Sequence, residues 1–162
     1  MREETAVGII GAGPAGLLLA NLLTQENVAC VVLEQHTREY IEHRTRAGAF
    51  EGRIVHLLDA HGLADTLLRD SIHHGGCEFR LDGKQFQVPY AELTGNAHYL
   101  YPQQSLARDL IASYLGRGGQ LRFSTRAESG EGCDGDRPVI RHLDRETGER
   151  HELHCRLTRI RE

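Results

Sequence analysis

The feature that most constrains the fold is a glycine-rich turn near the start of the chain. The apolar run 6–10 leads into the turn 11–16, and the leucine-rich stretch 17–25 follows it. An apolar run of this kind predicts a strand buried on both faces, and the leucines predict a buried helix. The β-rich run 28–33 then ends on Glu34. This order predicts a βαβ unit and an α/β fold of Rossmann type.

Each glycine of the turn has its own physical role in such a unit. Gly11 lets the chain turn tightly out of the strand, Gly13 lets a diphosphate approach the backbone, and Gly16 lets the helix pack closely. The first helical turn, which holds Pro14 and Ala15, offers free N–H groups and a partial positive charge to phosphates. We therefore predict a dinucleotide site at these five residues.

Glu34 completes the pattern at the carboxyl end of the second predicted strand. A carboxylate there can accept hydrogen bonds from both ribose hydroxyls of an adenosine. A G-x-G-x-x-G motif alone is weak evidence, but here the strand, the helix, the second strand and the acid all agree. The alternative is a glycine-rich turn that binds nothing.

Arg44 and Arg46 follow in a polar segment. Alternate residues of an extended segment point the same way, so this pair could clamp a diphosphate from outside the helix. Because Glu39, Glu42 and Glu51 lie nearby, a solvated basic loop is the alternative. The spacing leaves both interpretations open.

The rest of the chain shows no internal repeat and no long linker. Asp82-Gly83 is a strong signal for a two-residue hairpin, because alternating polar and apolar residues flank it. A glycine-rich, acidic loop is expected at 129–136. Helices are expected at 54–58, 63–69 and 106–114, and strands at 78–81, 85–88, 121–125, 139–143 and 152–157.

Composition excludes several classes of function. The chain of 162 residues is 40% hydrophobic and 26% charged, which is typical of a globular protein. Its net charge of −4 argues against nucleic acid or an anionic membrane as the main partner. The uncharged stretch 5–25 is long enough to span a membrane, but glycines and a proline interrupt it.

Neither a metal site nor a disulfide framework is indicated. The four cysteines (Cys30, Cys77, Cys133 and Cys155) form no C-x-x-C motif, so free thiols in a reducing cytoplasm are expected. His73 and His74 are adjacent and project to different sides, which does not suit a shared metal ion.

Several segments together resemble the 4-hydroxybenzoate 3-monooxygenase family of FAD-dependent aromatic hydroxylases. The glycine-rich turn is common to many flavoproteins, whereas the R-x-R-A-G and Tyr-Pro-Gln segments are more specific. The resemblance covers about residues 5–155 and rests on 11–19, 32–34, 44–48, 101–103, 108–110 and 135–138. It implies reduction of FAD by NADPH or NADH and transfer of one oxygen atom from O₂ to an activated phenol.

The resemblance also implies roles for single residues. Gly11, Gly13 and Gly16 would border the FAD diphosphate, and Glu34 would bind the adenosine ribose. Gln103 would hydrogen-bond the FAD chain, and His74 would be the solvent end of a proton relay to the substrate phenol. One segment would run along the cofactor, with Arg46 near the diphosphate: Arg44, Thr45, Arg46, Ala47, Gly48 and Ala49.

The chain departs from the family pattern at two places. Gln35-His36 stands where the family typically has an arginine that serves NADPH, and Arg38 is a candidate substitute. After Cys155 the family continues through an apolar strand, whereas 156–162 is basic. We therefore expect 1–155 to be the N-terminal part of an FAD-binding domain, 156–162 to be an atypical tail, and part of the sheet to be left unpaired.

The sequence supports three functional hypotheses. The first is an FAD-dependent aromatic monooxygenase of cytoplasmic location, present as a truncated fragment and acting on a small aromatic molecule. The second is a catalytically inactive FAD- or nucleotide-binding remnant. The third is another FAD-dependent phenol hydroxylase. Exposed sheet would favour association of copies into a homo-oligomer.

Overall fold

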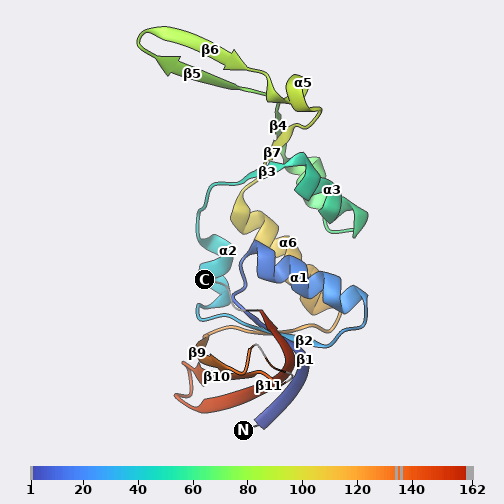
Figure 1. The fold of residues 1–162 in the computed structure, drawn as a ribbon, viewed down its shortest axis with the longest axis vertical. Helices are drawn as coiled ribbons and strands as arrows, with labels where there is room; N and C mark the ends of the chain where they lie inside the picture. Colours follow the sequence, from blue (N-terminus) through green and yellow to red (C-terminus); the bar gives the residue numbers. More distant parts are fainter. Residues whose placement is uncertain (1, 134, 136, 160–162) are drawn as a thin grey trace. The chain divides into compact units, whose positions relative to one another are not determined.

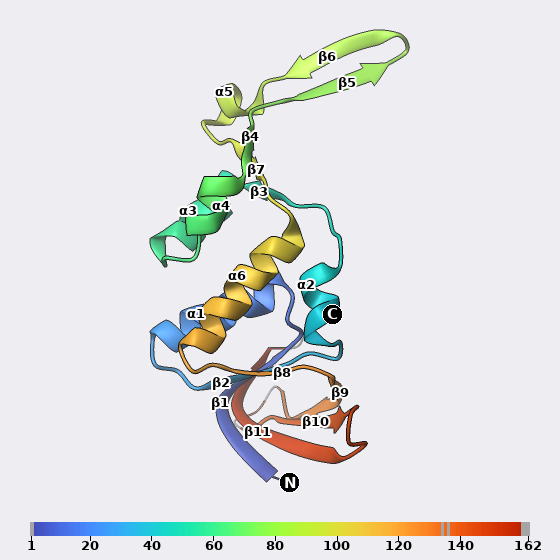
Figure 2. The ribbon, with the colours of Figure 1, turned by 180° about the vertical axis from the view of Figure 1, so that it is seen from behind.

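The computed structural model describes residues 2–133, 135 and 137–159 and divides into two compact units. The first is made of residues 1–44 and 107–162 and is called the sheet unit here. The second is made of residues 45–106 and is called the hairpin unit. Figure 1 shows both as ribbons, and Figure 2 shows them from behind.

The sheet unit is built on a six-stranded sheet in the order β8-β2-β1-β11-β10-β9. Its neighbours β8, β2, β1 and β11 run parallel, whereas β11, β10 and β9 pair antiparallel. The strands are β1 (Arg2–Ile10), β2 (Cys30–Leu33), β8 (Gln120–Arg122), β9 (Thr125–Glu131), β10 (Val139–Asp144) and β11 (Arg150–Arg159). The predicted βαβ unit and α/β class are confirmed, while 129–131 belong to β9 instead of the predicted loop.

Two helices pack together on the parallel strands. α1 (Pro14–Gln25) follows the glycine-rich turn, and α6 (Gln103–Gly116) contributes its residues from Ala107 onward to this unit. The buried Asn21 side chain donates to the carbonyls of Leu17 and Leu110, at 2.9 and 3.0 Å, and so joins the helices. Figures 1 and 2 both show them side by side. Among the residues described, no helix is long and apolar enough to cross a membrane.

Tyr114 ties α6 to the sheet. Its side chain is fully buried, and its hydroxyl donates to the carbonyl of Cys30 at 2.8 Å. Burial and the neighbouring Cys30 raise the pKa of this phenol far above its usual range. The hydroxyl therefore remains a neutral donor at any physiological pH, and it holds the helix against β2.

The basic segment after Cys155 is part of the sheet and does not leave β1 unpaired. Val7, Gly8 and Ile9 of β1 pair in parallel with residues 157–159 of β11. The expectation of a missing neighbour is therefore wrong for β1, because backbone pairing does not require apolar side chains. The segment nevertheless lacks the burial typical of an apolar strand, since Leu157 is 67% exposed. Residues 160–162 lie outside the described part of the chain.

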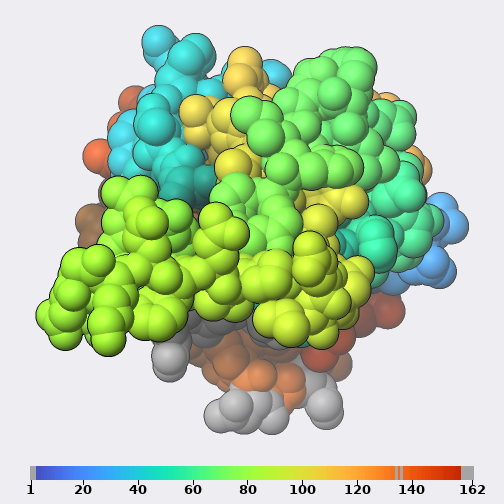
Figure 3. Space-filling view, turned by 90° about the horizontal axis from the view of Figure 1, so that it is seen from above, coloured from blue at the N-terminus to red at the C-terminus, as the bar shows by residue number. Residues whose placement is uncertain are grey.

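The hairpin unit contains short elements that the sequence pattern did not all predict. Its helices are α3 (Gly52–Ala60), α4 (Asp65–Asp70) and α5 (Tyr90–Thr94). The strands β3 (Ala49–Glu51), β7 (His98–Leu100) and β4 (Ile72–His74) form one sheet in that order. β5 (Cys77–Leu81) and β6 (Lys84–Val88) form the predicted hairpin, which turns at Asp82 and Gly83, both with positive φ. Figure 3 shows this hairpin at the surface, in light green.

A close backbone contact joins two distant segments of the hairpin unit. The Tyr101 amide donates to the Gly48 carbonyl at 2.8 Å and so extends the pairing of β3 with β7. A Cβ atom at Gly48 would lie 1.8 Å from the Tyr101 carbonyl oxygen and 2.8 Å from the Gln103 nitrogen. Both obstacles are backbone atoms, so only glycine fits at this position.

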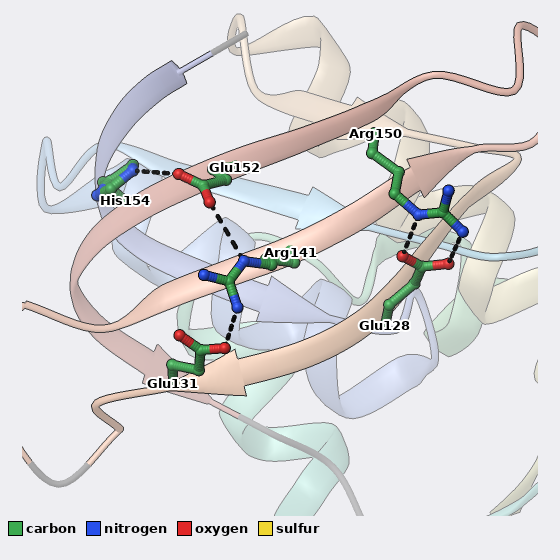
Figure 4. A network of polar contacts seen from close by, with 6 residues as sticks. All are labelled: Glu128, Glu131, Arg141, Arg150, Glu152 and His154. Atoms are coloured by element: carbon green, nitrogen blue, oxygen red, sulfur yellow. Dashed lines mark hydrogen bonds and ion pairs between the residues drawn. The ribbon is translucent and has the colours of Figure 1, made fainter.

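Opposite charges lie along the three antiparallel strands β9, β10 and β11. Arg141 contacts Glu131 on one side and Glu152 on the other, and Arg150 contacts Glu128, as Figure 4 shows. The guanidinium groups lower the pKa values of Glu128 and Glu152. Because these side chains are solvent-exposed, each pair contributes little to stability.

His142 lies on the buried face of β10, and its ring lacks hydrogen-bond partners. It is 2% exposed, and neither ring nitrogen has a hydrogen-bond partner. Burial is the main cause that lowers its pKa, helped by the positive charges of Arg122 on β8 and His151 on β11. Glu3 on β1 and Asp144 on β10 oppose this shift. The folded state therefore favours neutral His142.

We predict that Gly48→Ala destabilises the chain by about 1–3 kcal/mol, the usual cost of forcing extra volume into a packed site. Chemical denaturation followed by circular dichroism measures the change. Gly75→Ala is the matched control, because a Cβ atom there meets only the Ala91 methyl at 3.4 Å. Equal stability of the two variants would contradict the contact.

We also predict an acid-sensitive stability that depends on His142. A histidine whose pKa is lowered on folding binds its proton more readily in the unfolded chain, so stability is lost as pH falls below the ordinary histidine range. Melting temperatures between pH 7.5 and 5 should fall less steeply for His142→Leu than for the parent chain. His43→Gln, at an exposed position, should retain the parent slope. Identical slopes for all three proteins would refute the prediction.

Candidate dinucleotide-binding site

The glycine-rich turn has the geometry that the sequence predicts. Gly11 has φ of +99°, in the left-handed region that favours glycine. A Cβ atom at Gly16 would lie 2.2 Å from the Gly11 carbonyl oxygen, so Gly16 lets α1 start directly against the turn. Gly13 is the N-cap of α1, and Pro14 and Ala15 begin its first turn.

The N-terminus of α1 is open to a ligand. Its N-cap residue, Gly13, makes no side-chain hydrogen bond to the helix, and the first turn has no acidic residue. The first N–H groups of a helix have no partner within the helix, and the helix dipole makes them attractive to anions. Glycine-lined backbone and free N–H groups together form a cradle in which a phosphate can approach the main chain.

Glu34 is fixed beside this cradle. Its carboxylate is 5% exposed and accepts hydrogen bonds from the Ala12 amide at 2.8 Å and from the His36 amide at 2.9 Å. One oxygen serves each amide, so each oxygen retains a further lone pair. The geometry therefore holds the carboxylate in one orientation and leaves it able to accept from ribose hydroxyls.

Three side chains form a column that begins two residues after Glu34. The His36 ring stacks on the Tyr40 ring, with 4.2 Å between the ring centroids. The Arg44 guanidinium lies over the Tyr40 ring, 5.3 Å from its centroid. Thr37 caps α2 (Arg38–His43) by accepting from the Tyr40 amide. Arg38, the candidate substitute for the missing arginine, is paired with Glu42 at 2.6 Å.

The other predicted cofactor residues belong to the hairpin unit. Thr45, Arg46 and Ala47 are exposed, whereas Gly48 is held against Tyr101 and beside the first residue of α6, Gln103. Ala49 begins β3. The structure thus brings Gly48 and Gln103 together. Because Arg44 and Arg46 belong to different units, the predicted clamp stays a prediction.

His74 lies on β4, and its Nδ1 is hydrogen-bonded to the hydroxyl of Tyr90. Nothing in the sequence pattern indicated Tyr90, because it is separated from His74 by the whole hairpin. The column of His36, Tyr40 and Arg44 could have been predicted from the sequence, because residues four positions apart are neighbours on the surface of a helix. Within the described part of the chain, no group of three His, Cys, Asp or Glu residues could hold a metal ion.

Comparison with known proteins identifies the family of this chain. The FAD binding domain family matches residues 4–158. The p-hydroxybenzoate hydroxylase of Acinetobacter baylyi is 38% identical over 109 residues, which are 67% of this chain and 27% of that protein. A probable NADH-specific resorcinol 4-hydroxylase of Rhodococcus jostii is 29% identical over 88% of this chain and 28% of its own length.

A solved structure shows the same fold. The p-nitrophenol 4-monooxygenase PnpA from Pseudomonas putida DLL-E4 superposes with a TM-score of 0.83 at 21% identity, over 98% of this chain and 40% of that one. This chain thus spans between 27% and 40% of the lengths of these three proteins. The family match covers nearly the whole chain and includes the glycine-rich turn, so the chain belongs to the FAD binding domain family.

Proposed function

We propose that this chain is the FAD-binding part of an aromatic monooxygenase that uses NADPH or NADH and O₂ to hydroxylate a phenol, with 4-hydroxybenzoate as the substrate. The observation that carries the proposal is the Glu34 carboxylate, which is fixed on the Ala12 amide of the glycine-rich turn. The identity to p-hydroxybenzoate hydroxylase supports the choice of substrate.

The residues present fit the cofactor. A diphosphate needs close approach to backbone and unpaired N–H groups, which the turn 11–16 and the start of α1 supply. The adenosine ribose needs an oriented acceptor, which Glu34 supplies. Bound FAD would supply the redox chemistry between the nicotinamide coenzyme and O₂. The chain's own residues bind and orient it: Gly11, Gly13, Pro14, Ala15, Gly16, Glu34, Arg44, Thr45, Arg46, Ala47, Gly48, Ala49 and Gln103.

The column of His36, Tyr40 and Arg44 is relevant to whether the chain uses NADPH or NADH. Arg44, the C-cap residue of α2, is held over the Tyr40 ring. It therefore provides a guanidinium in a chain that has Gln35-His36 where the family has an arginine. We propose that Arg44 recognises the coenzyme, and that the chain works in the cytoplasm. A resorcinol hydroxylase named as NADH-specific is among the relatives, so both coenzymes belong in the test.

A second candidate is another phenol hydroxylase, since relatives include hydroxylases of resorcinol and of 3-(3-hydroxyphenyl)propionate. A third is an inactive nucleotide-binding remnant. The test is the purified chain with FAD, NADPH or NADH, and each phenol in turn, with products separated by chromatography. Hydroxylated product identifies the substrate, and FAD binding without oxidation of either coenzyme supports the remnant.

We expect FAD binding but no measurable 3,4-dihydroxybenzoate from the 162 residues alone. Hydroxylation needs the phenol held beside the cofactor in a closed site, and this chain corresponds to 27% of the p-hydroxybenzoate hydroxylase length. NADPH consumption without product is the expected residual reaction. Stoichiometric product would show that the chain suffices or that a second chain completes it.

For the cofactor site itself we predict that Glu34→Ala weakens FAD binding by about 1–3 kcal/mol, the scale of a hydrogen bond to a charged group. Gly13→Val should abolish binding, because a branched side chain would occupy phosphate space. Flavin fluorescence on titration measures both. Glu42→Ala, which removes only an exposed ion pair with Arg38, is the control. Parental affinity in the Glu34 and Gly13 variants would refute the assigned site.

A further inference from the structure

Three side chains of the hairpin unit converge where β4, α5 and β7 meet. His74 and His98 are direct partners in the antiparallel pairing of β4 with β7. Tyr90, the first residue of α5, is hydrogen-bonded through its hydroxyl to His74 Nδ1. The Tyr90 ring also meets the His98 ring edge-on, with 4.5 Å between the centroids. The Tyr90 side chain therefore contacts both histidines, and its hydroxyl bonds to His74.

The direction of this hydrogen bond decides which tautomer His74 adopts, because a hydroxyl can donate to a histidine ring nitrogen or accept from it. Burial raises the pKa of the Tyr90 hydroxyl, so the phenol keeps its proton at neutral pH. His74 Nδ1 is the hydrogen-bond partner that the structure gives this hydroxyl, and His98 Nδ1 is buried without any partner. If the hydroxyl donates to Nδ1, the proton of neutral His74 resides on Nε2.

The hydrogen-bonded pair of His74 and Tyr90 lies beside two hollows in the surface of the hairpin unit. His74 lines one of about 460 Å³, together with Cys77, Glu78 and Glu92. Tyr90 and His98 line a second, of about 380 Å³, whose charged residues are Glu51 and Arg53. The hydrogen bond between Tyr90 and His74 therefore lies at the border of both hollows, where a proton taken up by His74 can reach solvent.

We propose that Tyr90 is a positioning residue that holds His74 in the Nε2-protonated tautomer and so makes Nε2 the atom that exchanges protons. This inference rests on the proposed function, together with the role that the family resemblance implies for His74 as the outer end of a proton path to the phenol. The family resemblance suggested His74, whereas the structure supplies Tyr90 and shows that Nδ1 is the ring nitrogen bonded to it. A hydrogen bond to one ring nitrogen commonly decides which nitrogen of a histidine reacts.

The test observes the histidine rings directly and does not depend on activity. In the 162-residue chain labelled with ¹⁵N, long-range ¹H–¹⁵N spectra report the protonation of each ring nitrogen. We expect His74 Nδ1 to be an unprotonated, hydrogen-bonded nitrogen in the parent chain. Tyr90→Phe should shift the His74 Nδ1 signal and populate the other tautomer. His74→Gln should in turn abolish any slowly exchanging Tyr90 hydroxyl signal.

Tyr99→Phe is the matched control, because Tyr99 contacts the ring of His73, 4.6 Å away, and should leave the His74 signals in place. The proposal is overturned if Tyr90→Phe leaves the His74 nitrogens unchanged, or if His74 carries its proton on Nδ1. Titration of the same samples with FAD tests the proposed function separately. Absence of FAD binding would refute the proposed function and leave the tautomer result standing.

Discussion

The Glu34 carboxylate on the Ala12 amide is the interaction on which the candidate site depends. It connects the end of β2 to the glycine-rich turn that follows β1, so the strand order of the sheet and the conformation of the turn fix each other. A buried carboxylate is costly unless polar partners surround it, and two backbone amides provide them. The same carboxylate makes an adenosine ribose a suitable partner, because the ribose hydroxyls can donate hydrogen bonds to it.

The local part of the site could be predicted from the sequence for a physical reason. Gly11 and Gly16 act within a few residues of each other, one through its positive φ and the other through contact with the turn, so a short motif contains the whole constraint. The βαβ unit is similarly local, since apolar runs and leucine spacing determine it. The Asp82-Gly83 hairpin was predictable because two residues with positive φ define that turn.

The parts that could not be predicted depend on contacts between distant residues. Gly48 is constrained by the carbonyl of Tyr101, and nothing near Gly48 in the sequence reveals this. The strands β3, β4 and β7 have three residues each, which is too short for an alternating pattern to identify them. The hydrogen bond between His74 and Tyr90 likewise requires β4 and α5 to meet across the intervening hairpin. The family resemblance named Gly48 and His74 but gave no account of what holds them.

The structure shows how the chain accommodates its two departures from the family pattern. Replacement of the expected arginine by the Gln35-His36 pair removes a guanidinium, but the His36 ring then stacks on Tyr40, and the Arg44 guanidinium lies over the Tyr40 ring. An arginine on an aromatic face loses little rotamer freedom when it binds a ligand, because the stack already restricts it. The basic segment after Cys155 behaves in the same way, since its backbone completes the pairing of β1 while Leu157 stays exposed. In both cases the backbone geometry tolerates the substitution, and the change falls on the side chains that face solvent or ligand.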